Sequence, residues 1–190
     1  AQTQPRSVWD SVFTVEQGRK IFKDAHDQYE TAFKKFPVFI PAADKAKIDA
    51  REQALIHYIQ AALNMAIASY EAAQTHDKET RMYDEALGDA AKEFEKIHSR
   101  YRDRNAGLYA RMWQGKCYEE QGEATKALGI YNELLSHPVE NNPSLKAIQD
   151  RTTHFKLICL NHPKRKEYPA AIEEALAWRK SASASEQRSQ

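Results

Sequence analysis

The chain has 190 residues, 42% of them hydrophobic, which is enough for one domain with a substantial core. Lysine and arginine total 28 against 27 aspartate and glutamate, so the net charge of +1 gives no electrostatic reason to expect nucleic acid or an acidic membrane as a partner. With only 6 glycines and 7 prolines, the composition predicts helix nearly throughout and no strands. No apolar stretch approaches the roughly 20 residues that span a bilayer, so no membrane span is predicted.

Residues 1–13 are expected to form an extension before the first helix. Ala1 and the polar run after it are what an export signal leaves when it is cut after a small residue. Removal of an initiator methionine, or a start within a longer chain, would give the same beginning. The segment 6–14, RSVWDSVFT, is similar to the segment before the haem domain of some exported bacterial c-type cytochromes. That resemblance implies a bacterial, exported protein, periplasmic or envelope-associated, with a cytoplasmic protein as the alternative. Since the chain has no CxxCH motif, no covalent haem is expected.

The first helix is predicted to begin at Thr14, because the segment 14–17, TVEQ, has the pattern of a capping box. Its apolar residues recur every three or four positions until Pro37 ends the helix. The next segment, 37–41, is the apolar sequence PVFIP, which its prolines keep out of a helix. We expect this connector to close over the end of the core, with a docking site as the alternative.

Two long helices should follow, from about Ala43 to Gln74 and then, after a break at residues 75–77, up to Tyr101. The first has a broad apolar stripe, which indicates that it contacts two neighbours. In the second, the apolar residues step by four and three in alternation. They are Tyr83, Leu87, Ala90, Phe94, Ile97 and Tyr101. The two helices are predicted to form a hairpin.

The segment 108–138 has small, aromatic and turn-forming residues at fixed offsets. They are Gly115, Tyr118, Gly122, Ala127, Tyr131, Leu134 and Pro138. Gly115 and Ala127 would let two short helices approach closely, and Gly122 would supply the turn between them. These offsets resemble those of a tetratricopeptide repeat. The segment departs from that pattern in two places. Pro138 comes one residue early, and the family's tryptophan lies two positions late, at Trp113, with Arg111 in its usual place.

After a turn-rich linker at 138–143, residues 143–181 predict a further hairpin, with Asn142 as the N-cap and Pro143 at the first helical position. Its internal loop, 161–166, is longer than the turn of a tetratricopeptide repeat, so this unit is a degenerate repeat. The polar, serine-rich residues 182–190 are expected to be a disordered tail.

The resemblance implies an all-α fold in which antiparallel hairpins stack as a short, right-handed TPR-like solenoid of about seven helices, in one domain over 14–181. It also implies a concave face, built by the first helix of each hairpin, that holds a partner segment. The positions of this chain that match such a groove are Tyr109, Met112, Lys116, Glu119 and Glu120. The alternative for these residues is packing on a neighbouring hairpin. A clamp for a C-terminal carboxylate is not expected, because Met112 and Lys116 stand where that clamp has lysine and asparagine.

The sequence offers no convincing reacting centre. The seven histidines are scattered, and the closest cluster of potential ligands, His154, Cys159 and His162, fits no zinc module, so neither a metal nor another cofactor is predicted. Motifs for phosphate loops and serine hydrolases are missing from the sequence. Cys117 and Cys159 lie within apolar helical patterns, so we expect both to be buried free thiols.

The sequence therefore predicts a scaffold or adaptor that binds a protein or peptide partner, and not an enzyme. A self-assembling structural subunit is the alternative, a homo-oligomer in which the connector Val38–Ile40 and the incomplete terminal repeats form the joints. An enzyme is the third and weakest reading of the sequence.

Overall fold

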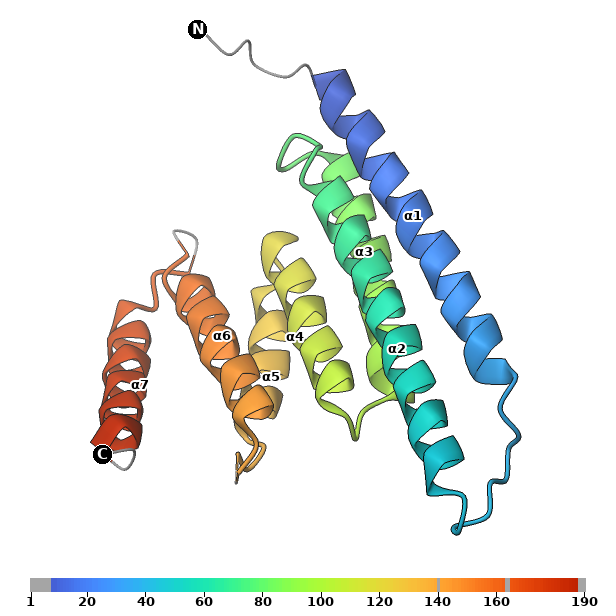
Figure 1. The fold of residues 1–190 in the computed structure, drawn as a ribbon. Coiled ribbons are helices and arrows are strands. Elements are labelled where there is room, and N and C mark those ends of the chain that lie inside the picture. Colours follow the sequence, from blue (N-terminus) through green and yellow to red (C-terminus); the bar gives the residue numbers. More distant parts are fainter. Residues whose placement is uncertain (1–7, 140, 163–164, 188–190) are drawn as a thin grey trace, which may run out of the picture. The chain divides into compact units, whose positions relative to one another are not determined.

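A computed structural model describes residues 8–139, 141–162 and 165–187, with side chains from residue 16 to residue 180 outside those gaps (Figure 1). In this part of the chain there are seven helices and no strand. The helices are α1 (Val8–Lys34), α2 (Lys45–Ala73), α3 (Arg81–Arg100), α4 (Asn105–Glu120), α5 (Ala124–Leu135), α6 (Pro143–Leu160) and α7 (Tyr168–Gln187). The prediction of an all-α fold with about seven helices is confirmed. No described helix combines the length and apolar character that a membrane crossing requires.

The structure has two compact units, Ala1–Ala110 and Arg111–Gln190, and the single domain over 14–181 stays a prediction. Within each unit, helices that follow one another in the chain pack against one another, as in a helical solenoid: α1 on α2 and α2 on α3 in unit 1, and α5 on α6 and α6 on α7 in unit 2.

Unit 1 begins with a helix that is longer than predicted. α1 starts at Val8 and runs through Thr14 and the rest of the predicted capping box, so the expected extension over 1–13 is wrong for residues 8–13. The physical reason is that a capping box only offers a favourable start. Nothing in the sequence from Val8 to Phe13 is a glycine or proline that would stop a helix from extending backwards.

The predicted hairpin of α2 and α3 is present, and local capping fixes its ends. Asp44 accepts a hydrogen bond from the Lys47 backbone N–H at 3.2 Å, and Thr80 accepts one from the Tyr83 N–H at 3.3 Å. The apolar stripe predicted for α3 is buried at Tyr83, Leu87, Ala90, Phe94 and Ile97, while Tyr101 follows the helix and is half-buried. These residues and the buried face of α2 make the core of unit 1.

Unit 2 contains the predicted turn between α4 and α5. Gly122 has a φ of +78°, the Gly122 N–H donates to the Glu119 carbonyl at 3.0 Å, and the Glu123 N–H donates to the Tyr118 carbonyl at 2.8 Å. This is the hydrogen-bond pattern of a Schellman motif, in which glycine is preferred because the backbone is left-handed. The turn role predicted for Gly122 is confirmed.

The ends of α6 and α7 were predicted with mixed success. Asn142 caps α6, accepting a hydrogen bond from the Leu145 N–H at 3.0 Å, and Pro143 is the first helical residue, as expected. The predicted disordered tail from residue 182 is wrong up to Gln187, because α7 continues that far. Alanine, serine, glutamate and glutamine are compatible with a helix, and no glycine or proline interrupts this stretch. Residues 188–190 lie outside the described part.

Candidate functional site

The predicted close approach of α4 and α5 is present at Gly115. A Cβ atom on this glycine would lie 2.6 Å from Cε1 of Tyr131 and 3.1 Å from Cγ2 of Ile130, both on α5. Tyr131 and Ala127 are fully buried. The aromatic ring of Tyr131, rather than Ala127, therefore occupies the space that the missing side chain leaves.

The remaining repeat positions follow from this packing. Leu134 is fully buried, and Tyr118 is half-buried, with the Lys126 Nζ 5.2 Å from the centre of its ring. Pro138 is exposed beyond the end of α5.

The residues predicted to contact a partner do not line an open groove. Met112 is fully buried, so the surface contact predicted for it is wrong. The side chains of Lys116, Glu119 and Glu120 are only 13%, 8% and 15% exposed. Tyr109 is half-buried and already engaged in an interaction of its own. The first helix of the repeat thus turns most of these groups inward.

Three of these residues form a compact charge network inside unit 2. The Lys116 Nζ lies 2.7 Å from Glu119 Oε1 and 3.2 Å from Glu120 Oε1, and 5.2 Å from the centre of the Phe155 ring on α6. The Tyr131 hydroxyl donates to Glu119 Oε2 at 2.9 Å. The alternative reading, packing on a neighbouring hairpin, therefore describes Lys116, which contacts Phe155 of the following hairpin, whereas Glu119 bonds to Tyr131 within its own hairpin.

Burial and charge set the protonation of this network. Burial disfavours the Lys116 ammonium, but the charges of Glu119 and Glu120 outweigh it and raise the Lys116 pKa. Burial, reinforced by the charge of Glu119, raises the pKa of the Tyr131 hydroxyl. The lysine is therefore charged and the tyrosine protonated at neutral pH, which matches the donor roles that the distances give them.

Both cysteines are buried free thiols, as predicted. Burial raises the pKa of Cys117, and burial with the nearby Glu119 charge raises that of Cys159 to about 11. The thiolate is the nucleophilic form of cysteine, so neither side chain is activated as a nucleophile at neutral pH.

The cluster His154, Cys159 and His162 is not gathered around one point. The two histidines are exposed while the cysteine is buried. Among the described residues, no group of three or more histidine, cysteine, aspartate or glutamate side chains is arranged to hold a metal ion.

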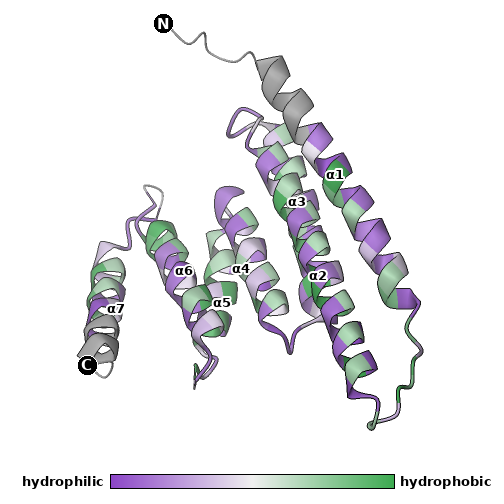
Figure 2. Cartoon of the chain, in the orientation of Figure 1, coloured by the Kyte–Doolittle hydropathy of each residue, from purple (hydrophilic) through white to green (hydrophobic). Residues whose placement is uncertain are grey.

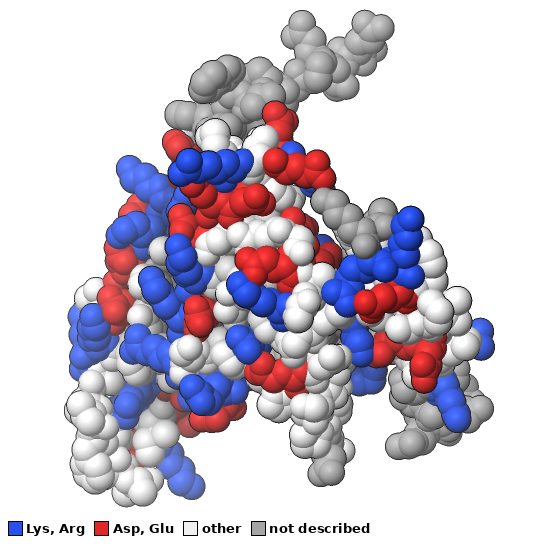
Figure 3. Space-filling view, turned by 180° about the vertical axis from the view of Figure 1, so that it is seen from behind, with Lys and Arg blue, Asp and Glu red and all other residues white. Residues whose placement is uncertain are grey.

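The connector between α1 and α2 is exposed rather than packed on the core. Val38 is 93% exposed and Phe39 is 79% exposed, so the expectation that the connector closes over the core is wrong for these two residues. Its backbone is nevertheless held. Arg51 Nη1 donates to the Val38 carbonyl at 3.0 Å, and the Asp44 N–H donates to the Pro41 carbonyl at 2.9 Å. In Figure 2 the connector is mostly green, and in Figure 3 this end of unit 1 is a white area at the lower left.

A cavity of 360 Å³ lies within unit 1, where α1, α2 and α3 meet, and sequence reasoning did not find it. Its lining combines apolar and polar side chains from three helices. They are His26 from α1; Tyr58, Ala62 and Met65 from α2; Glu93, Lys96, Ile97 and Arg100 from α3; and Tyr101 at the end of α3. Such a volume lies at the lower end of the range of small-molecule sites.

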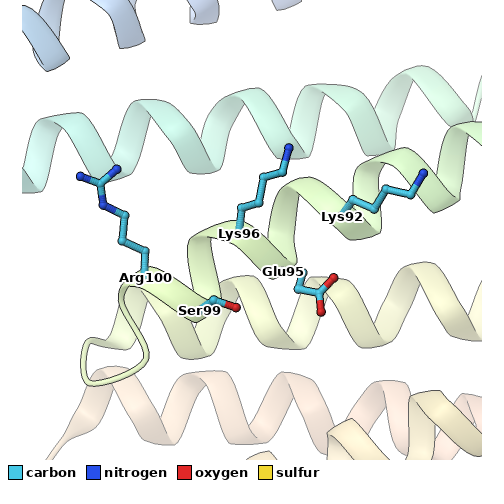
Figure 4. A pocket seen from close by; sticks show the side chains of 5 residues that line it. All are labelled: Lys92, Glu95, Lys96, Ser99 and Arg100. Carbon is cyan, nitrogen blue, oxygen red and sulfur yellow. The ribbon is translucent and has the colours of Figure 1, made fainter.

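Two cations of this cavity belong to a longer row on α3. Lys92, Lys96 and Arg100 point to the same side of the helix, towards α2, while Glu95 and Ser99 point to the other side (Figure 4). Together these five residues line a shallow hollow of 560 Å³. The four-residue spacing of the cations was visible in the sequence. Their meeting with His26 and Tyr58 was not, because it depends on how α1 and α2 pack on α3.

Comparison of the chain with protein-family models, curated proteins and solved structures found no match.

Proposed function

We propose that this chain is a TPR-like helical scaffold or adaptor that binds a partner protein, and that it is not an enzyme. The observation that carries the proposal is the exposure of Val38 and Phe39 on a connector whose backbone is held in place. Burial of exposed apolar side chains by a partner makes binding more favourable. Because the segment is already ordered, binding costs little conformational entropy of its backbone.

The anchoring of the connector supports this role. The Arg51 guanidinium carbon lies 5.8 Å from the centre of the Phe33 ring, so one side chain holds both the last turns of α1 and the Val38 carbonyl. Residues 37 and 41 are prolines, which restrict the backbone on each side of the exposed pair. A partner would therefore meet a surface that is largely preorganised.

The chemistry of the interior also favours binding over catalysis. The buried titratable groups described in unit 2 include two protonated thiols, a protonated tyrosine and a lysine neutralised by two carboxylates. Each of these has the protonation state of a structural group rather than of an activated nucleophile or base.

The protein family and the cellular location are also parts of this proposal. The offsets at 108–138, with the close approach at Gly115 and the turn at Gly122, support a TPR-like protein. The similarity of residues 6–14 to exported bacterial cytochromes supports a periplasmic or envelope-associated location, with the cytoplasm as the alternative.

The test is a pull-down in which the chain is the bait, with an extract of the organism that encodes it. The double variant Val38→Ser, Phe39→Ser should lose a partner that the wild type retains. Met82→Ser is the matched control, because Met82 is an apolar side chain on α3 that is 63% exposed and distant in sequence from the connector. When affinity is measured with the purified partner, the double variant should bind about 100-fold more weakly, because it lacks two apolar side chains that the partner would bury. Equal binding by the wild type and the double variant would refute the docking role of the connector.

Self-assembly is the second candidate, and one observation favours it. Tyr168, Ile172 and Leu176 are spaced four residues apart along α7, and they are 47%, 60% and 51% exposed. Such a row on one face of a helix suits an antiparallel contact with the same row of a second copy. Light scattering over a range of concentrations tests this candidate. A dimer that disappears in Ile172→Ser, Leu176→Ser and persists in the connector variant would favour self-assembly, and a monomer at all concentrations would exclude it.

A further inference from the structure

We propose that the cavity between α1, α2 and α3 binds a small organic carboxylate that carries an apolar group. This inference is independent of the proposed partner binding, because the cavity contains no residue of the connector.

The charges that line the cavity favour a single negative charge. Lys96 and Arg100 contribute +2 and Glu93 contributes −1, which gives the lining a net charge of +1. Glu93 is already engaged, since the Ser69 hydroxyl donates to its Oε2 at 2.7 Å. A carboxylate supplies one negative charge, whereas a phosphate dianion would bring a second one close to Glu93.

The neighbouring acids are neutralised by cations other than these two. Glu30 pairs with Lys34 at 3.0 Å and accepts a hydrogen bond from the Tyr58 hydroxyl at 3.3 Å. Asp27, next to His26, pairs with Lys23 at 2.6 Å. Glu93 is therefore the one acidic side chain that offsets the charges of Lys96 and Arg100 in the described lining, and one positive charge stays unmatched.

Neither of these cations has a carboxylate partner among the described residues. The closest polar contact of Arg100 is a long one, from its Nη1 to the Tyr58 hydroxyl at 3.5 Å. Its guanidinium carbon lies 5.8 Å from the centre of the Tyr58 ring and 5.5 Å from that of Tyr101. Figure 4 shows Arg100 and Lys96 on the same side of α3. A guanidinium stacked on aromatic rings and an ammonium one turn away are the usual donors to a bound carboxylate.

Tyr101 adds a neutral donor. Its hydroxyl oxygen is buried and has no hydrogen-bond partner in the described part of the chain. A buried hydroxyl without a hydrogen-bond acceptor destabilises the protein. A ligand oxygen that accepted a hydrogen bond from it would therefore bind more tightly. Burial raises the Tyr101 pKa, which keeps this hydroxyl protonated and able to donate.

The rest of the lining explains why the carboxylate should carry an apolar group. Ala62, Met65 and Ile97 are apolar, and the Tyr58 and His26 rings lie with their centres 4.9 Å apart. An inorganic anion would leave these surfaces uncovered. An aryl or alkyl group would be shielded from water by them and would add the hydrophobic contribution.

The experiment uses isothermal titration calorimetry of the full chain with 4-phenylbutyrate. The matched probes are 4-phenylbutan-1-ol, which lacks the charge, and inorganic phosphate, which lacks the apolar group. We expect saturable binding of 4-phenylbutyrate and no measurable binding of either control. Failure of 4-phenylbutyrate to bind at millimolar concentrations would overturn the proposal, and so would binding of phosphate with equal affinity.

Substitutions of residues that line the cavity test whether the carboxylate binds there. Lys96→Gln and Arg100→Gln should each weaken binding about tenfold or more, the usual effect of removing a charged hydrogen bond. Tyr101→Phe removes only the hydroxyl, so it should weaken binding while the protein stays at least as stable as the wild type. Lys92→Gln is the control, because Lys92 lies on the same face of α3 but does not line the cavity. Equal weakening by Lys92→Gln would mean that general charge attraction, and not this cavity, holds the anion. Binding by the connector variant Val38→Ser, Phe39→Ser should be unchanged, which separates this proposal from the proposed function.

Discussion

Replacing Gly115 with alanine tests the close approach of α4 and α5. In an exposed helical position this substitution would stabilise the protein by about 1 kcal/mol. Here the added Cβ would lie 2.6 Å from the Tyr131 ring. The ring has little freedom to withdraw, because it is fully buried, its hydroxyl is bound to Glu119, and its centre lies 6.3 Å from that of Phe155.

The cost of overpacking such a site is about 1–3 kcal/mol. After the gain in helix propensity of about 1 kcal/mol, we expect a net loss of up to about 2 kcal/mol. With a urea m-value of about 1–2 kcal/mol/M, the midpoint of unfolding should fall by up to about 1–2 M. Tryptophan fluorescence measures this for unit 2 alone in a Trp9→Phe background, because the other two tryptophans, Trp113 and Trp178, lie in unit 2.

The matched control is Gly129→Ala on α5. Gly129 is exposed, and a Cβ on it would meet no atom within 4 Å. This variant should be more stable than the wild type by up to about 1 kcal/mol. If Gly115→Ala were as stable as Gly129→Ala, the contact with Tyr131 would be absent and the account of this helix pair would be wrong.

Three further predictions concern stability and reactivity. Gly107→Ala should destabilise unit 1 by more than Gly115→Ala does unit 2, because its Cβ would lie 2.0 Å from the Tyr101 carbonyl oxygen, which is backbone; thermal unfolding of the two variants checks the order. The Tyr131 pKa is raised in the folded state, so its stabilisation is complete below the unfolded pKa of about 10 and is lost as the pH rises. In Tyr131→Phe, the free energy of unfolding should therefore fall less steeply above that pH in urea titrations; an unchanged slope would contradict this. Cys117 and Cys159 should react with a thiol reagent such as DTNB only after unfolding, and rapid reaction in the native protein would show that they are accessible.

Local signals in the sequence predicted much of the fold. Gly122 was predicted as a turn residue because a left-handed backbone favours glycine, and Asn142 was predicted as an N-cap because its side chain can accept from the backbone. The buried face of α3 followed from the strict separation of apolar and polar residues along that helix. In each case the physical cause acts over a few residues.

The predicted partner-binding face of α4 failed for a different reason. Buried residues occur all around this helix, at 107, 108, 110, 112, 114, 115 and 117, so no single apolar stripe marks its inner face. Assigning an outer face from the repeat pattern alone therefore placed Met112 on the surface, although the structure buries it completely.

The cavity of unit 1 could not be predicted from spacing. His26, Tyr58 and Arg100 come from three helices, and their meeting depends on the register with which those helices pack.

The hydrophobicity of the connector led to the wrong prediction that it is buried. An apolar run is usually buried, but the prolines at 37 and 41 keep this one out of a helix. Arg51 donates a hydrogen bond to its backbone, and in this conformation the side chains of Val38 and Phe39 are exposed.

The charge network of Lys116 with Glu119 and Glu120 limits how this protein can change during evolution. Loss of the lysine alone would remove the ammonium that neutralises two mostly buried carboxylates, and breaking a buried ion pair in this way costs about 3–5 kcal/mol, a large share of the stability of a typical domain. Evolution could replace this network by uncharged residues in two ways. The substitutions at 116, 119 and 120 could occur together, or the lysine could be lost first in a protein whose carboxylates are protonated at acidic pH. Related chains should accordingly covary at 116, 119 and 120, and such covariation would identify them even where the rest of the sequence has diverged.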